Sequence, residues 1–314
     1  MLMNPRHCLI LFLDGVGLGE DDPASNPFVS AETPHLTHLL GPRWYLKERG
    51  LIQAAWASLA PTDANLGVDG RPQSASGQAA ILTGRNVPQI VQGHIGPWPS
   101  KTVRAVIEEG NLFHDTVAAG QPAVLLNAYP QPYFDAIARG RRMYSSIPLA
   151  VVKAGLPLLT TTDLHAGRAI SPGFTNTDWR DRLEDPDVPI LTPFAAGQRL
   201  AHLAQRHTFS FFDHWLSDIV GHRGPLTDAV DHLETLDAVI GGLLEAWDDD
   251  AGLLIITSDH GNLEDKRTTS HTRNPVPTIL AGRGHAQLAA GIHNLTDIAP
   301  AVRQFLGLKS SLTT

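Results

Sequence analysis

The chain has one cysteine, no long apolar run and no excess of basic residues, and each absence excludes a class of protein. Cys8 has no partner for an internal disulfide, and its place in an apolar run predicts a buried thiol. No apolar stretch approaches the roughly 20 residues of a membrane-spanning helix. Asp14 interrupts the amino-terminal apolar run, which does not fit a secretory signal. We therefore expect a cytoplasmic protein without a membrane partner.

The formal net charge of −8 over 314 residues argues against a broad nucleic-acid-binding surface. A small anionic substrate would instead need a local positive site. The hydrophobic fraction of 42% fits an ordinary globular core, and the length allows one large α/β domain or two smaller ones. The sequence shows neither low-complexity segments nor internal repeats, and it predicts no oligomeric state.

Strand and helix patterns alternate in the two outer parts of the chain. The apolar run from His7 to Leu13 is typical of a central strand that is buried on both faces. Similar runs predict strands at 208–212, 252–257 and 276–280. Apolar residues at helical spacing predict a long amphipathic helix from Leu226 to Trp247. This alternation favours an α/β sandwich with a mostly parallel sheet.

Helix boundaries are indicated by capping residues. A short buried helix is expected to begin near Ser74 and to end at Gly84. Thr33 before Pro34 is a candidate N-cap for a second helix. Thr296 is expected to cap the last helix, which should end near Gly307.

The middle of the chain differs, because prolines crowd into residues 86–206 and the strand candidates, 123–127 and 156–160, are short. We interpret this segment as an inserted cap domain. Residues 1–85 and 207–314 would then form one discontinuous core. In such sheets, functional residues gather at the carboxyl ends of the strands.

Polar residues stand at three such ends. Asp259 and His260 directly follow an apolar strand, and burying a carboxylate there is costly unless it is paired or metal-bound. Asp14 follows the first strand, although an aspartate before glycine also fits an ordinary turn. Asp218 and His222, four residues apart with Gly221 between, are expected on a tight loop that turns both inward, or else in a solvated turn.

Together with His271, these residues make three aspartates and three histidines, enough ligands for two metal ions. The mixture of oxygen and nitrogen donors suits Mn²⁺ or Zn²⁺ better than Ca²⁺ or Mg²⁺. Two neighbouring metal ions are a common device for phosphoryl transfer. Ser74, at a helix start that favours an anion, is the candidate nucleophile, with a plain N-cap as the alternative.

The arrangement of motifs resembles the alkaline phosphatase superfamily, and within it the branch of cofactor-independent phosphoglycerate mutases and phosphopentomutases. The matching stretches occur in family order and cover most of the two outer segments. They are LFLDGVG at 11–17, NPFVSAETPHL at 26–36, SASGQAAILTGR at 74–85, SDIVGHRG at 217–224, TSDHGNLED at 257–265 and HTRNPVP at 271–277. No motif of the family matches residues 86–206.

The resemblance implies a three-layer sandwich with a mostly parallel central sheet and a smaller inserted cap. It implies two divalent metal ions, Mn or Zn. The residues that would hold one ion are Asp14, Ser74, Asp259 and His260, and those that would hold the other are Asp218, His222 and His271. The family nucleophile lies ten residues before the glycine of a Thr-Gly pair, here Thr83-Gly84, which selects Ser74 and leaves Ser76 as the alternative.

The implied activity is a phosphomutase that acts on a small phosphorylated metabolite through a phosphoserine. A phosphatase or phosphodiesterase and a non-catalytic metal-binding protein are the alternatives, whereas a sulfatase is disfavoured by serine at the nucleophile position. The substrate-binding pattern of the long mutases is absent from the insertion. Basic residues there that are candidates for contact with a phosphate or carboxylate, or else form a solvated turn, are Arg139, Arg141, Arg142, His165 and Arg168.

Overall fold

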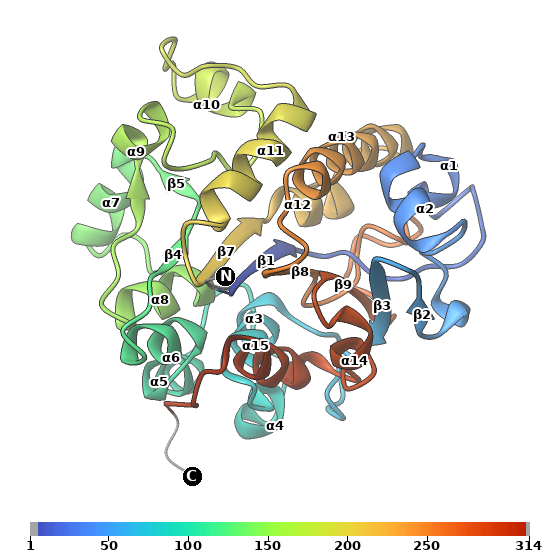
Figure 1. The fold of residues 1–314 in the computed structure, drawn as a ribbon, viewed down its shortest axis with the longest axis horizontal. Coiled ribbons are helices and arrows are strands. Elements are labelled where there is room, and N and C mark those ends of the chain that lie inside the picture. The colour runs from blue at the N-terminus through green and yellow to red at the C-terminus, as the bar shows by residue number, and fades with distance from the viewer. Residues whose placement is uncertain (1–5, 312–314) are drawn as a thin grey trace.

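The computed structural model describes residues 6–311 and confirms the predicted α/β class. Helices cover both faces of a seven-stranded central sheet with the order β2-β3-β9-β8-β1-β7-β4 (Figure 1). Its strands are β1 His7–Leu13, β2 Ile52–Gln53, β3 Ala57–Thr62, β4 Ala123–Leu125, β7 Phe209–His214, β8 Gly252–Thr257 and β9 Val276–Gly282. A second sheet pairs β5 Ala128–Tyr129 with β6 Leu159–Thr160.

The central sheet is mixed. Strands β8, β1, β7 and β4 pair in parallel, whereas β9 pairs antiparallel with both β8 and β3, and β2 is antiparallel to β3. Within the described residues, five of the seven strands therefore share one direction. The register places Leu13 beside His214 and Phe12 beside Thr257, so β1, β7 and β8 end at the same edge.

The central strand β1 connects the three layers. All of its residues are buried, and they alternate between two hydrophobic clusters because successive side chains of a strand point to opposite faces. Cys8, Ile10 and Phe12 join one cluster, and the intervening leucines join the other. The continuous apolar run in the sequence is thus explained by burial on both faces of the sheet.

Each cluster is closed by its own helices. One face is covered by α3 Ser74–Thr83, α5 Lys101–Glu109, α6 Leu112–Ala118, α8 Ser146–Lys153, α14 His285–Ala289 and α15 Ile298–Leu306. The other is covered by α1 Pro27–Ser30, α2 Pro34–Leu40, α11 Pro193–Ala204 and α13 Leu226–Glu245. The remaining helices are α4 Val87–Val91, α7 Gln131–Ala138, α9 Thr161–His165, α10 Thr177–Arg182 and α12 Leu216–His222.

Most predicted elements are confirmed, including the end of α3 at Gly84 in the left-handed conformation. Three local predictions are wrong. The segment from Asp218 to His222 is a helical turn rather than a tight loop. Of the strand predicted at 156–160, only the last two residues form β6.

The third error concerns a cap. Thr33 is the N-cap residue of α2, as predicted, although its side chain makes no capping hydrogen bond. Thr296, in contrast, lies inside a 3₁₀ turn, Leu295–Asp297, whose capping box is made by Asn294 and Asp297. The backbone breaks there as the sequence indicates, but other side chains satisfy the free amides.

Segment 86–206 is divided between the core and a smaller unit. It contributes β4 to the central sheet, and α5, α6, α8 and α11 to the covering layers. Between them, β5 and β6 form the second sheet, and Leu164, Trp179 and Val188 belong to a separate small hydrophobic cluster. The boundaries at 85/86 and 206/207 stay a prediction, and we propose a narrower cap made of residues 126–145 and 154–192, which leaves α8 in the core.

None of the helices in residues 6–311 combines the length and the apolar character needed to cross a lipid bilayer.

Candidate metal centre

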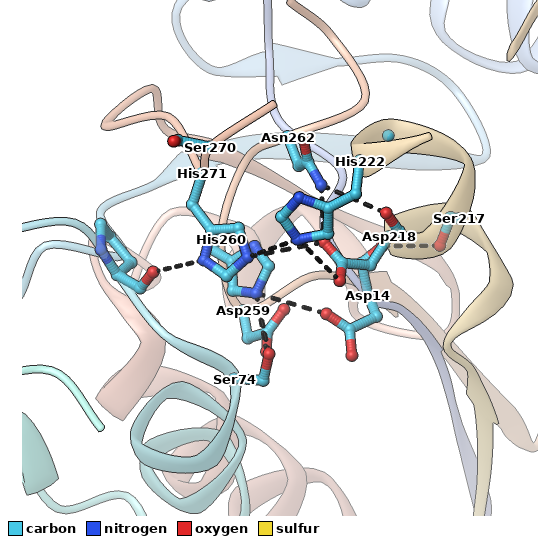
Figure 2. A network of polar contacts seen from close by, with 12 residues as sticks. Asp14, Ser74, Ser217, Asp218, His222, Asp259, His260, Asn262, Ser270 and His271 are labelled. Carbon is cyan, nitrogen blue, oxygen red and sulfur yellow. Dashed lines mark hydrogen bonds and ion pairs between the residues drawn. The ribbon is translucent and has the colours of Figure 1, made fainter. Parts of the chain in front are cut away.

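The seven predicted metal-site residues lie together beside the carboxyl ends of the central strands (Figure 2). Asp14 follows β1, Asp259 and His260 follow β8, and Asp218 and His222 stand one helical turn apart on α12. Ser74 is the first residue of α3, and His271 comes from the loop before β9. Because β1, β7 and β8 end in register, residues more than 200 positions apart share one site.

Four of these residues form what we call the inner cluster: Asp14, Ser74, Asp259 and His260. The Nε2 atom of His260 lies at its centre. It is 3.0 Å from the Ser74 Oγ, 3.3 Å from Asp14 Oδ1 and 3.7 Å from Asp259 Oδ2. The predicted ligands of one ion therefore converge on one point.

The other three residues, Asp218, His222 and His271, form the outer cluster. The Nε2 atoms of the two histidines are 3.1 Å apart. Asp218 Oδ2 lies 3.3 Å from His222 Nε2, and its Oδ1 lies 3.7 Å from His271 Nε2. The His260 and His271 rings stack with their centroids 3.6 Å apart, so the two clusters touch. The assignment of each cluster to one ion stays a prediction.

Backbone carbonyls orient the outer histidines. His222 Nδ1 lies 2.6 Å from the Thr269 carbonyl oxygen, and His271 Nδ1 lies 2.8 Å from that of Pro72. Since a carbonyl can only accept, each Nδ1 carries the proton, and each Nε2 of a neutral ring presents a lone pair. Two lone pairs 3.1 Å apart repel each other, whereas a cation between them would be held by both.

The inner carboxylates also fit a cation. Asp259 is fully buried, and no described residue gives either of its oxygens a hydrogen bond of normal geometry. Burial, followed by neighbouring carboxylates, raises the pKa of Asp14 and of Asp259 well above the usual range. Burial lowers the pKa of His260, and His271 lowers it further. Buried oxygens without donors beside a neutral imidazole suit a divalent cation.

Ser74 and Ser76 lie on the same helix but face different surroundings. The Ser76 hydroxyl is buried, donates to the Gln73 carbonyl and accepts the Ile95 amide. Ser74 instead faces His260. Helix α3 comes this close to the inner cluster because Gly77 has no side chain; a Cβ there would lie 2.9 Å from the Asp259 Cβ. This geometry supports Ser74 over Ser76 as the nucleophile.

Residues that orient the ligand loops were missed from the sequence. Buried Glu264 accepts the backbone amides of Gly17 at 3.0 Å and Asn262 at 2.8 Å, and also bonds the side chains of Thr272 and Asn274. It therefore ties together three ligand-bearing loops. A glutamate seven residues after a buried strand, within the stretch that carries Asp259 and His260, was the available signal.

The ligands themselves also have supporting contacts. Asn262 Nδ2 donates to Asp218 Oδ1 at 2.7 Å. The Ser217 hydroxyl donates to the Asp14 carbonyl at 2.6 Å, and the Val16 amide donates to Ser258 Oγ. Such outer contacts hold a metal ligand in one orientation before the ion binds.

A cavity of about 540 Å³ opens onto both clusters. Ser74 and the three outer residues line it, while Asp14, Asp259 and His260 lie beneath. Arg71 and Arg223 also line the cavity. They supply the local positive charge that an anionic substrate needs in a chain with a net negative charge. The sequence interpretation missed them because it sought basic residues in the insertion.

The five basic residues predicted as substrate contacts do not line this cavity. His165 lies 2.8 Å from Asp185, and Arg168 makes two hydrogen bonds to Asp163. Arg139 is 4.0 Å from Asp135 on the same helix, and Arg141 is exposed. The Arg142 guanidinium lies over the Tyr133 ring. Contact of these residues with substrate stays a prediction.

Known proteins resemble both the sequence and the fold. The model of the Metalloenzyme superfamily matches residues 196–310, which include the outer cluster and two inner ligands. A 2,3-bisphosphoglycerate-independent phosphoglycerate mutase of Pseudomonas putida is 39% identical over 146 residues, 44% of this chain and 27% of that protein. The Methylobacillus flagellatus protein of the same name is 32% identical over 130 residues, 38% of this chain and 25% of that protein. The chain thus spans about a quarter of the length of these curated relatives.

Solved structures share the whole fold at low sequence identity. The alkaline phosphatase of the Antarctic bacterium TAB5 aligns with a TM-score of 0.57 and 13% identity, over 98% of this chain and all of that one. A Pyrococcus horikoshii protein aligns with a TM-score of 0.56 and 16% identity, over 98% of each chain. The family model and the named relatives each match less than half of this chain, and together with the shared fold they support a place in the alkaline phosphatase superfamily of metalloenzymes, beside the phosphoglycerate mutases.

Proposed function

We propose that this protein is a metal-dependent phosphoryl-transfer enzyme that acts on a small phosphate monoester through a phosphoserine at Ser74. The observation that carries the proposal is the position of the Ser74 Oγ. It lies at a helix amino terminus, lines the 540 Å³ cavity and is 3.0 Å from the central His260 Nε2. A hydroxyl there is exposed to substrate on one side and to the inner cluster on the other.

The inner cluster would hold one divalent ion and the outer cluster a second. The coordination chemistry favours Mn²⁺ or Zn²⁺, because both clusters mix carboxylate oxygens with imidazole nitrogens. When bound, such ions would supply positive charge beside the serine oxygen and the phosphoryl oxygens.

The chain's own groups would bind and orient the ester. Arg71 and Arg223 face the same cavity as Ser74 and would pair with phosphate oxygens. The amino terminus of α3 adds the partial positive charge of its free amides. The Ser74 Oγ, having lost its proton, would attack phosphorus while the ester P–O bond breaks and the alcohol oxygen gains a proton.

The fate of the phosphoserine separates a mutase from a hydrolase. A second hydroxyl of the retained alcohol would take the phosphoryl group in a mutase, whereas water would release inorganic phosphate in a phosphatase. The named relatives favour the mutase. The small cap and its unmatched sequence favour the hydrolase, which we keep as the second candidate. A non-catalytic metal-binding role is disfavoured because all seven residues occur together.

Phosphorus NMR with Mn²⁺ or Zn²⁺ and a panel of phosphoglycerates and sugar phosphates tests the proposal. A mutase moves the resonance to that of an isomeric ester, and a phosphatase produces inorganic phosphate. Ser74→Ala should abolish either change, whereas Ser76→Ala should retain the chemistry and lose about 1 kcal/mol of stability. Undiminished turnover in Ser74→Ala would remove the serine from this role.

A further inference from the structure

A second cavity, of about 390 Å³, lies between the cap and the start of α12 and has no part in the phosphoryl transfer described above. We call it the aromatic cavity, because the rings of four aromatic residues form much of its wall. The lining residues used below are Tyr129, Tyr133, Trp179, Trp215, Arg142 and Leu216. Its volume falls in the range of small-molecule sites.

The aromatic cavity adjoins the metal-site cavity at two places. Leu216 lines the first and Ile219 lines the second, one turn apart on α12. With a rise of about 1.5 Å per residue, only about 5 Å of helix separates them. The Arg142 guanidinium lies 5.6 Å from the Trp98 ring, and Trp98 follows Pro97, which lines the metal-site cavity.

Exposed apolar side chains mark this junction. Trp98, Leu183 and Ile219 are each between 41 and 44% exposed, whereas large apolar residues in this chain are mostly buried. Leu183 lines the aromatic cavity and Ile219 lines the metal-site cavity. Each cavity thus has an exposed apolar side chain in its wall, which suits a ligand that extends from one cavity to the other.

The charges of the aromatic cavity restrict the kind of ring that fits. The Arg142 guanidinium lies 4.8 Å from the centre of the Tyr133 ring. The face of the Tyr133 ring is thus already occupied by a cation. Arg182 adds a second positive charge to the wall of the cavity, and its Nε lies 3.5 Å from Asp178 Oδ1. A quaternary ammonium ligand is therefore disfavoured. A flat, electron-rich ring that stacks on tryptophan or tyrosine is favoured.

We propose that the aromatic cavity binds the alcohol part of the phosphate ester, and that this part carries a flat unsaturated ring. The inference rests on the proposed function, since it names the class of ester that Ser74 would meet. It places the phosphate at the metal centre and the ring at the start of α12, against Trp179 and Trp215. Phosphoglycerate, which has no ring, would leave the cavity unused.

Matched substrates test the proposal in the metal-loaded protein. Adenosine 5′-monophosphate is compared with ribose 5-phosphate, and 2-phenylethyl phosphate with ethyl phosphate. Within each pair the ester is alike and only the ring differs. We expect kcat/KM to be at least about tenfold higher for the ring-bearing member. Preference in both pairs indicates a general ring site, and preference in the adenosine pair alone indicates a nucleobase site.

Variants of the aromatic cavity link that preference to its wall. Trp215→Ala should reduce the ring preference, measured as the ratio of kcat/KM within each substrate pair, by roughly tenfold. Trp179→Ala should do the same, and because Trp179 is buried in the small cluster of the cap, its folding is checked by circular dichroism. Trp56→Ala is the control, since Trp56 is 70% exposed and does not line the aromatic cavity.

Equal kcat/KM within both substrate pairs, or a preference that survives Trp215→Ala, would overturn the proposal. A calorimetric titration separates it from the proposed function. Ser74→Ala protein with Mn²⁺ should bind adenosine 5′-monophosphate roughly tenfold more tightly than ribose 5-phosphate, and Trp215→Ala should remove that difference. If this binding difference is found but the wild type turns over no ester, the proposed function is refuted and the ring-binding role of the aromatic cavity is supported. If the binding difference is absent, the ring-binding role is refuted.

Discussion

The inner and outer clusters use the same residue types at different depths. Asp259 and His260 of the inner cluster are fully buried, and Asp14 is 7% exposed. In the outer cluster, the side chains of Asp218 and His222 are 18% and 34% exposed. Removing water from a charge costs several kcal/mol, so the inner cluster depends on a compensating cation more than the outer one does. In the proposed enzyme, an ion in the inner cluster would therefore stabilise the fold more than an ion in the outer cluster.

The largest expected effect comes from removing one histidine of either cluster. His260→Ala and His271→Ala should each lower phosphoryl transfer by about 10³-fold or more, because each removes a ligand from a different ion. Metal analysis should find about one ion per chain in each variant and about two in the wild type. Loss of both ions from one variant and none from the other would show that the two clusters are not separate sites.

Asp213 is a buried carboxyl outside both clusters. It tests whether burial alone is enough to raise a carboxyl pKa and so to lower stability at neutral pH. Burial raises the pKa of Asp213 to about 7, and its Oδ1 has no hydrogen-bond partner among the described residues. A raised carboxyl pKa means that the folded state keeps a proton that the unfolded chain releases. Stability is then complete below about pH 4 and is lost as pH rises towards 7.

Asp213→Asn should remove this pH dependence, worth about 4 kcal/mol between pH 4 and pH 8. Urea unfolding of wild type and variant at several pH values measures it. If the stability of the wild type depended on pH as little as that of the variant, burial would not raise the pKa of Asp213.

Glu264 tests how far the two clusters depend on a shared support. Glu264→Gln places an amide donor where the carboxylate accepts two backbone N–H groups, so unfolding free energy should fall by about 2–3 kcal/mol. Affinity for both ions should fall together, because the loops of both clusters are tied to this residue. Thermal unfolding and metal titration give the two values.

Glu245→Gln is the matched control for that substitution. Glu245 is exposed and accepts one hydrogen bond from Gln198, so the same chemical change should alter stability by less than about 0.5 kcal/mol. Weakened binding of only one ion in Glu264→Gln would mean that the clusters are supported independently.

The smallest effect is expected at the arginines of the outer rim. Arg71→Met and Arg223→Met should raise KM for a phosphate ester by roughly tenfold each, through loss of a charge-assisted contact with phosphate, and should leave metal content unchanged. Steady-state kinetics measures this effect, with Arg283→Met, outside the cavity, as control. An unchanged KM in both variants would place the phosphate elsewhere.

Much of the fold was predictable because buried strands and helices have characteristic spacings of apolar residues in the local sequence. Strand β1 has only apolar neighbours on both faces, and its run of seven residues shows this directly. The helix from Leu226 to Glu245 has the spacing of one buried face. The antiparallel direction of β9 was not predictable, because a buried strand has the same composition whichever way it runs.

In the candidate site, too, local sequence patterns predicted some features and not others. Asp259 and His260 were identifiable as candidates because polar residues directly after a buried strand have few uses other than function. Asp14 also fits an ordinary turn, so only its combination with the other motifs singled it out. The local sequence did not predict that Asp218 and His222 stand on a helix, where spacing of four residues places both on one side.

The sequence by itself determined the α/β class and predicted the candidate ligands and the candidate nucleophile, because these depend on which residues follow which within a few positions. Only the tertiary structure decided which positive charges meet the substrate. Arg71 and Arg223 reach the cavity because the loop before α3 and the end of α12 meet there, whereas Arg168 and His165 are held by nearby acids. Contacts between segments that are distant in the sequence depend on how the layers pack, so no local sequence pattern predicts them.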